Sequence, residues 1–400
     1  MHFQNSIKCL SRRNRIILFL SVLFTIYITD SLLFATSDIR ILNIARRLLP
    51  LCIGIIALLY YGRIDKYVLA ICVSVFISMI LAGRLTNGVF YITQIGIFIF
   101  AYYYTKLVDF DLFADCYLIW MRIIAIISLT CFLFSKQIYI LSFIPTIRNV
   151  SNYNFKSLFF TNVPLSLSLA RRNWGPFWEP GVFQFYLNVA LLLSFFRRQQ
   201  NWFLDVMLFI VSDLTTLSGA SLLPIPFILL AYLLNEENRS VLERIEVFLL
   251  LSIGIFLIFF MGYFDEIIFK IIGVGVDSGS MGYRLGSAIA NIRATLAYPL
   301  FGASPEYQDS LRENAIFLLN GVRTSGNTNT ILGYFASFGI FVGGYLSYRL
   351  YRSTSVFTDV LVSRICILLA IVLMTSNENL MQSSLLVVLV FLKQKLKPDS

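Results

Sequence analysis

The chain predicts an all-α polytopic membrane protein with about twelve transmembrane helices. Of its 400 residues, 58% are hydrophobic and only 14% are charged, whereas soluble domains carry about 25% charged residues. Apolar runs long enough to cross a bilayer recur along the chain, and short basic segments separate several of them, as expected of cytoplasmic turns. These observations predict that residues 1–400 form a single integral membrane domain.

The predicted spans follow from apolar runs that carry few charges. The first run follows a basic tail and lacks a clear small-residue cleavage site, so we expect an uncleaved helix rather than a signal peptide. Asp213, Pro224 and Pro226 interrupt the region around 202–234, which a helix tolerates where it faces protein or a wet cavity. The expected spans are 16–34, 45–61, 67–83, 88–104, 117–134, 181–196, 202–218, 219–234, 247–264, 327–348, 359–376 and 380–392.

Basic residues predict the orientation of these spans. The basic segments lie before residue 16, at 62–66, 197–198 and 349–352, and after residue 392. All of them fall on one face, which we expect to be cytoplasmic together with both termini. The two longest connections, 135–180 and 265–326, then lie on the outer face. They are short for independent domains, so we expect them to contain short helices that cover a cavity in the helical bundle.

Composition also limits the chemistry. The formal net charge of +10 is typical of topology determinants and headgroup contacts, so we predict membrane lipids and no nucleic acid as partners. His2 is the only histidine, which excludes histidine-based zinc sites and general bases, and we expect no metal or cofactor. The sequence Asp109-Phe110-Asp111 resembles the DxD of nucleotide-sugar glycosyltransferases, but its turn is too short for their fold.

The first outer connection ends in a dense group of charged and aromatic residues, Arg171-Arg172-Asn173-Trp174-Gly175-Pro176-Phe177-Trp178-Glu179-Pro180. Charges beside a bilayer cost free energy unless they face water, a partner or an anionic ligand. Arginine suits phosphate oxygens, and Trp174 and Trp178 could stack on sugar rings. Alternatively, the tryptophans form an interfacial belt, and Arg171 and Arg172 reach headgroups or pair with Glu179.

The second outer connection contains a predicted helix that starts with Ser280 as its N-cap and breaks at Pro299-Leu300-Phe301-Gly302. Arg284 and Arg293 flank an apolar stripe, so we expect this helix to lie in the membrane interface. Its arginines then point either to a lipid-linked diphosphate or to headgroups. The stripe consists of Leu285, Ile289, Ile292 and Leu296, and further candidate cations are Arg312 and Arg323.

Two polar stretches lie at the outer ends of predicted spans. Residues 213–221 place Asp213 and several hydroxyls where they line the cavity or bond to the local backbone. Residues 325–330, which include Asn327, open a late span, and helix capping is the simplest explanation of that stretch. Gly339 and Gly343 in the same span form a GxxxG motif, which predicts a helix-packing face.

These elements, in this order, resemble the superfamily of bacterial O-antigen polymerases (Wzy) and O-antigen ligases. The resemblance covers residues 171–344, and each of its elements has low specificity by itself. The elements are Arg172 with Phe177-Trp178-Glu179-Pro180-Gly181, Thr216-Leu217-Ser218-Gly219, Arg284 with Pro299-Leu300-Phe301-Gly302, and Asn327-Thr328 with Gly339. Ligases typically have a histidine in the late outer loop, where this chain has Ser325, Asn327 and Asn329 instead. That departure favours a polymerase.

The resemblance implies glycosyl transfer at the periplasmic face of the bacterial inner membrane, between oligosaccharides linked to undecaprenyl diphosphate. It implies that Arg172 and Arg284 stabilise the departing diphosphate without a metal. Glu179 then either takes the proton of the acceptor hydroxyl or orients Arg172. The further residues expected to bind substrate are Arg171, Trp174, Trp178, Arg293, Arg312, Arg323 and Asn327.

A separate chain-length regulator is a further partner that the resemblance implies. Three alternatives remain open: an O-antigen ligase, a flippase of lipid-linked oligosaccharides, and a transporter. A flippase or transporter is expected to carry charges inside its spans. Here the candidate ligand-binding cations concentrate in the two outer connections, and Asp213 and Arg364 are the nearest examples of charges inside spans.

Overall fold

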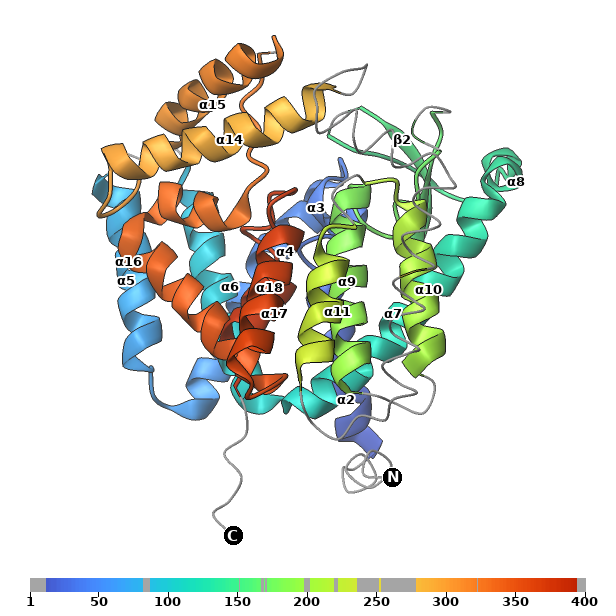
Figure 1. The fold of residues 1–400 in the computed structure, drawn as a ribbon, viewed down its shortest axis with the longest axis horizontal. Coiled ribbons are helices and arrows are strands. Elements are labelled where there is room, and N and C mark those ends of the chain that lie inside the picture. The colour runs from blue at the N-terminus through green and yellow to red at the C-terminus, as the bar shows by residue number, and fades with distance from the viewer. Residues whose placement is uncertain are drawn as a thin grey trace. The chain divides into compact units, whose positions relative to one another are not determined.

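The chain is mostly helical in a computed structural model (Figure 1), which confirms the predicted helical class. The structure describes residues 12–81, 87–150, 152–166, 169, 171–197, 202–218, 222–235, 252, 278–321 and 323–393. The chain forms two compact units. The first unit comprises residues 1–64, 96–218 and 382–400, and the second unit comprises residues 65–95 and 219–381.

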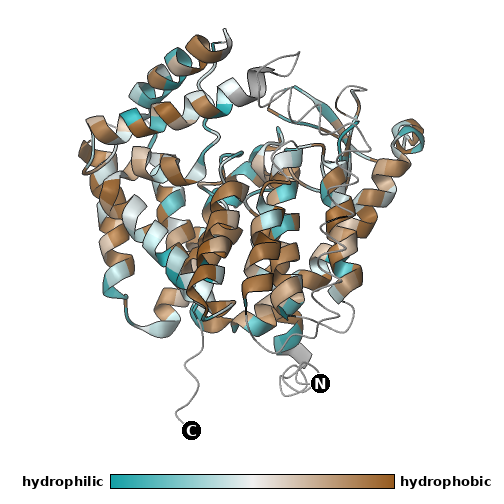
Figure 2. Cartoon of the chain, in the orientation of Figure 1, coloured by the Kyte–Doolittle hydropathy of each residue, from teal (hydrophilic) through white to brown (hydrophobic). Residues whose placement is uncertain are grey.

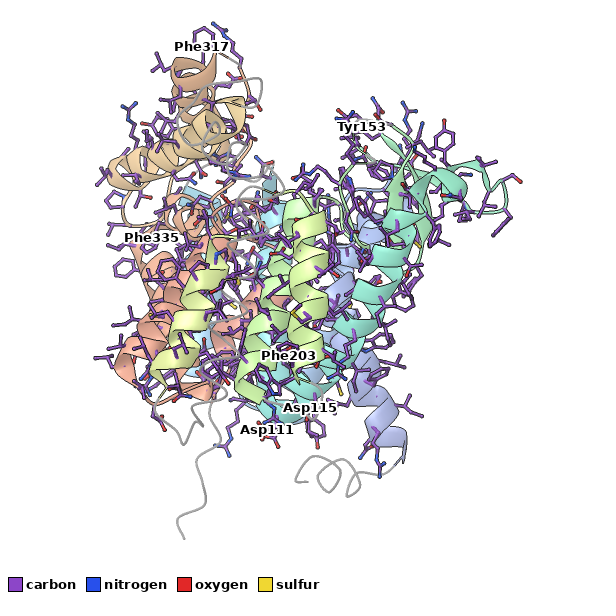
Figure 3. The ribbon with its side chains drawn as sticks, turned by 45° about the vertical axis from the view of Figure 1, so that its right-hand side comes forward. Asp111, Asp115, Tyr153, Phe203, Phe317 and Phe335 are labelled. Carbon is purple, nitrogen blue, oxygen red and sulfur yellow. The ribbon has the colours of Figure 1, made fainter. Side chains whose placement is uncertain are left out.

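The first unit is built around helix α7 (Phe110–Leu133), which packs against α2, α9 and α10. Helix α9 is buried over nearly its whole length, and its buried side chains include the polar Gln184 and Asn188. Figure 3 shows Asp111 and Asp115 at the end of α7 opposite to Tyr153, which lies beside a small sheet. The other helices are α2 (Arg12–Tyr27), α3 (Leu32–Ala35), α4 (Arg40–Tyr61), the later part of α6 (Gly88–Leu107), α9 (Pro180–Arg197), α10 (Trp202–Thr215) and α18 (Ser384–Phe391).

The first outer connection carries more than the predicted short helices. After α8 (Ser135–Ile140), the strands β1 (Thr146–Arg148), β2 (Asn154–Leu158) and β3 (Thr161–Pro164) form an antiparallel sheet in the order β1-β2-β3. Buried and more exposed side chains alternate along β2, with Phe155 facing inward, as a strand with one covered face requires. The connection thus contains a short helix, as predicted, and in addition a small sheet that the sequence did not predict.

The second unit contains α16 (Thr330–Ser353), against which α5, α14 and α17 pack. Helices α14 and α15 form a hairpin that lies across one end of α5 and α16 (Figure 1). The chain leaves α14 after Ala297, which confirms the predicted break at Pro299. Ser280 lies within α14 and is not its N-cap. The other elements are α5 (Lys66–Leu81), the start of α6, α11 (Pro224–Leu234), α14 (Ser278–Ala297), α15 (Pro305–Asn320), η2 (Thr354–Val356) and α17 (Leu361–Met374).

The apolar stripe predicted on α14 faces outward. Leu285, Ile292 and Leu296 are exposed, whereas the buried face consists of small residues such as Ala290 and Ala294. An apolar surface that is left uncovered in a helix with flanking arginines fits a position in the membrane interface.

Within the described residues, three helices are long and apolar enough to cross a membrane: Arg40–Tyr61, Phe110–Leu133 and Thr330–Val356. Figure 2 shows hydrophobic residues along most of the helices of the chain. Of the three long helices, α4 exposes much of its apolar surface. Two predicted spans differ from the structure: 16–34 is divided into α2 and α3, and in 219–234 residues 222–223 are not helical and α11 begins at Pro224, whereas 219–221 lie outside the described residues. The predicted span 247–264 lies outside the described residues.

The two glycines of the predicted GxxxG motif do not share one continuous helix face. Gly339 has φ of 78° and kinks α16, and a Cβ at this position would overlap the carbonyl oxygen of Leu300. The kink leaves backbone groups of α16 without helical partners. They are bonded instead by the turn after α14: Ile340 N donates to Pro299 O (2.8 Å) and Ala303 N donates to Ala336 O (2.7 Å). We call these two hydrogen bonds the backbone clamp.

Substituting Gly339 by Ala is expected to open the backbone clamp, because the new Cβ meets Leu300 and the backbone conformation is strained. The expected loss of stability is about 2 kcal/mol or more, measured by thermal unfolding of the protein in nanodiscs. Gly344→Ala is the matched control, since nothing lies within 4 Å of a Cβ there. Equal midpoints for the two variants would contradict the role given to the clamp.

Candidate functional site

The segment Arg171–Pro180 is a rigid platform in the first unit, because its backbone is bonded to three other segments. Asn162 N of β3 donates to Gly175 O (2.7 Å), and Leu32 N donates to Pro176 O (2.9 Å). Asn173 N donates to the carbonyl oxygen of Thr215 at the end of α10 (2.9 Å). A segment tied down in this way holds its side chains in place without secondary structure of its own.

Aromatic packing supports the platform from below. The Phe177 ring stacks on Tyr186 of α9 with centroids 4.2 Å apart, and Gly175, with φ of 52°, leaves room for the ring of Phe183. Trp174 is 6% exposed and packs against Phe155 and Leu32. Because its ring lies in this core, little of Trp174 is accessible to a sugar, and its substrate-binding role stays a prediction.

The remaining side chains of the platform are more accessible. Arg171 is exposed, and Arg172, Trp178 and Glu179 are half-buried. A cleft beside Arg172 holds about 10 Å³, which is room for about one water molecule. This cleft is therefore too small to hold a sugar ring.

Arg172 bonds to an irregular turn that follows α10. Its Nε donates to Thr216 O (3.0 Å), and the next residue, Leu217, has φ of 48°. A positive φ is unfavourable for a leucine, and such strained residues cluster at functional sites. The hydroxyls of Thr215 and Thr216 bond to local carbonyl oxygens of α10, as one of the two sequence interpretations expected.

Glu179 lies immediately before α9, and its carbonyl oxygen accepts hydrogen bonds from the backbone of Val182 and Phe183. Its side chain forms no salt bridge with another described residue. The pairing of Glu179 with Arg172 that the sequence allowed is therefore not observed in the described part of the chain.

In the second unit, the predicted arginines occupy different environments. Arg284 is half-buried on α14, and Arg293 is exposed on the same helix. Arg323 is exposed and lies over the ring of Phe317 on α15, 5.4 Å from its centroid. Their roles as phosphate ligands stay predictions.

Arg312 is buried and has a structural set of partners. Its guanidinium donates to Asp309 (2.8 Å), to Ser325 O (3.1 Å) and to Gln308 (2.6 Å). Gln308 in turn donates to Ala303 O and Ala336 O beside the backbone clamp. Burial lowers the pKa of Arg312, and the Asp309 carboxylate opposes that shift. These bonds favour positioning of α15 over substrate binding.

Asn327 is the centre of a polar cluster between α14 and the start of α16. Its side-chain oxygen accepts hydrogen bonds from Ser287 Oγ (3.1 Å), Asn291 Nδ2 (2.9 Å) and its neighbour Asn329 N (3.1 Å). Asn329 caps α16 through Leu332 N (3.0 Å), which confirms the capping interpretation. Three donors occupy the Asn327 oxygen and its amide nitrogen donates to Met381 Sδ (3.7 Å), so its predicted contact with substrate stays a prediction.

Sequence reasoning missed the ion pairs inside the first unit. Arg122 of α7 makes a bidentate pair with Asp205 of α10 (2.6 and 2.7 Å). Arg197 of α9 pairs with Asp111 (2.6 Å) and Asp115 (3.3 Å) at the start of α7. Arg122 lies within an apolar run, so its charge could have been noticed in the sequence. Its partner Asp205 is 83 residues away, and the sequence does not show that the two residues meet.

A buried carboxylate was missed as well. Asp30 is 4% exposed and accepts a hydrogen bond from the Tyr186 hydroxyl (2.5 Å). Within the described residues, no three Asp, Glu, Cys or His side chains are grouped so as to hold a metal ion.

Comparison with known proteins adds no identification. No model of a known protein family matches the chain, no curated protein matches its sequence, and no solved structure matches its fold.

Replacing Asn173 by Ala is expected to loosen the platform. The Asn173 side chain accepts from Gly175 N (3.1 Å) and donates to Thr215 Oγ1 (3.0 Å), and removing it leaves buried groups without partners, at a cost of about 1–3 kcal/mol. Thermal unfolding and limited proteolysis measure the effect. Arg171→Ala, at an exposed position, is the control for folding, and an unchanged Asn173→Ala protein would show that the backbone bonds suffice.

Proposed function

We propose that this protein is an O-antigen polymerase, or a polymerase of a related surface polysaccharide, in the bacterial inner membrane. The main support for this proposal is the platform. Its backbone is hydrogen-bonded to three other segments, and it carries Arg171 and Arg172 together with Trp178 and Glu179. In the proposed topology about twelve spans cross the membrane, both termini are cytoplasmic and the platform faces the periplasm.

The proposed reaction is transfer of a growing glycan from undecaprenyl diphosphate to a new lipid-linked repeat unit. The acceptor hydroxyl oxygen forms a bond to the anomeric carbon of the donor, and the bond from that carbon to the diphosphate oxygen breaks. Negative charge develops on the departing diphosphate, and Arg172 and Arg284 stabilise it without a metal. Arginine remains charged at any working pH and matches phosphate geometry.

The acceptor proton passes to the Glu179 carboxylate in this proposal. Glu179 has no salt bridge to another described residue, which favours the proton-accepting role over the orientation of Arg172. Its half-buried position at the start of α9 keeps it within the platform. A chain-length regulator remains a proposed partner.

One observation favours a transporter or flippase as the second candidate. The first unit carries charge inside its helices: the Arg122–Asp205 pair, and Asp213, which is 2% exposed. One carboxylate oxygen of Asp213 has no partner in the described part of the chain. Charged groups inside spans mark substrate or ion pathways in membrane proteins. A ligase is a weaker candidate, since the late outer loop lacks a histidine.

Deletion and complementation of the gene distinguish these functions. The readout is the ladder of chain lengths that the surface polysaccharide forms on a gel. A polymerase deletion is expected to leave a single repeat unit on the lipid core, whereas loss of all glycan would indicate a ligase or flippase. An unchanged ladder would contradict the whole proposal.

In complementation, Arg172→Ala and Arg284→Ala are each expected to reduce polymer formation about a hundredfold. Arg40→Ala, at an exposed position on α4, is the control and should restore the full ladder at matched expression.

Glu179→Gln is expected to abolish polymer formation while the protein remains folded, because the amide cannot accept the proton. General base catalysis contributes about 10²–10⁴-fold to a rate, so a purified enzyme should show a loss of that order in kcat. Glu179→Asp retains a carboxylate and should recover part of the activity. Polymer of full length from Glu179→Gln would eliminate the base assignment.

A further inference from the structure

A groove of about 500 Å³ opens in the second unit at the turn between α14 and α15. Leu81 at the end of α5 forms one part of its lining, and Tyr298, Pro299, Leu300 and Phe301 form most of the remainder. The volume is within the range of small-molecule sites, about 300–1,000 Å³. The backbone clamp keeps Pro299 against α16, so this part of the groove is held in shape.

The turn that lines the groove is bonded to a helix that is long and apolar enough to cross a membrane. Pro299 O accepts from Ile340 N of α16, and α16 belongs to one of the three helices able to cross a membrane. Ile340 and the adjacent Phe341 are 53% and 59% exposed, and Leu81 and Leu300 in the groove are 64% and 53% exposed. Exposed apolar side chains are therefore present both in the groove and on the helix to which its turn is bonded.

A cation lies one helical turn from the groove. Arg293 precedes the groove residue Ala297 by four positions on α14, and residues at this spacing share a helix face. Arg293 is exposed and forms no salt bridge with another described residue. An apolar groove beside an available guanidinium matches a ligand with a long hydrocarbon chain and a phosphate at one end.

We propose that this groove binds the isoprenoid chain of a polyprenyl-phosphate lipid and that Arg293 contacts its phosphate. The choice of an isoprenoid over an ordinary phospholipid rests on the proposed polymerase function, whereas the binding of a phosphate-bearing chain rests on the groove and Arg293. The proposal gives Arg293 a role in lipid binding that is separate from stabilisation of the leaving group.

Photocrosslinking of the full-length protein tests the groove without any polymerase assay. A photoreactive benzoylphenylalanine replaces Leu300 in protein reconstituted into phosphatidylglycerol nanodiscs that contain a small fraction of undecaprenyl phosphate. The matched control carries the same group at Ile56, an exposed apolar residue of α4 that is 65% accessible. Adducts are identified by mass spectrometry of the intact protein.

The expected result at Leu300 is an undecaprenyl phosphate adduct enriched about tenfold over the fraction of this lipid in the bilayer. At Ile56 the adducts should follow bulk lipid composition. Arg293→Ala should reduce the enrichment at Leu300 about tenfold, as expected for the loss of a charge-assisted hydrogen bond. Arg293→Lys should retain part of it.

Adducts at Leu300 that simply follow bulk lipid composition would overturn the isoprenoid assignment, and enrichment unaffected by Arg293→Ala would overturn the role of Arg293. The outcome is independent of the polysaccharide ladder. Enrichment together with an unchanged ladder would leave the lipid site standing and remove the polymerase. A ladder that collapses to a single repeat unit, without any enrichment at Leu300, would support the polymerase and overturn the lipid site.

Discussion

Backbone hydrogen bonding where helices stop is the constraint on which both units depend. In an apolar environment each unpaired N–H or C=O group costs several kcal/mol, so an irregular segment must find partners. In the first unit the platform obtains them from Leu32, Asn162 and Thr215, and in the second unit the turn after α14 obtains them from α16. The platform and the turn after α14 are therefore anchored by backbone hydrogen bonds to neighbouring segments.

Charge is distributed according to the same requirement. Two arginines form ion pairs between helices of the first unit: Arg122 with Asp205, and Arg197 with Asp111 and Asp115. On the platform and on α14, Arg171 and Arg293 are exposed and have no salt bridge in the described part of the chain. Because neither cation pairs with an acidic side chain of the described residues, an anionic ligand or a lipid headgroup can bind them without breaking an observed ion pair.

The platform and the groove make different contributions to the proposed function. The platform offers charge and a carboxylate on a rigid support, as transfer from a lipid diphosphate requires. The groove offers an apolar surface with one cation beside it, as the lipid part of the same substrate requires. Each feature is formed by contacts within its own unit, so a test that removes the role proposed for one leaves the other unaffected.

The sequence by itself determined that the chain is helical and apolar, that α14 ends before Pro299, and that arginines gather in residues 171–172 and along α14. These properties follow from local composition and spacing. Only the tertiary structure decided that Trp174 is a core residue and that Gly339 kinks α16. It also decided that Arg312 donates to Ser325 O and that Gln308 donates to Ala336 O beside the backbone clamp. The burial of a side chain and the partner of a backbone group depend on segments distant in the chain, and local sequence patterns carry no record of those contacts.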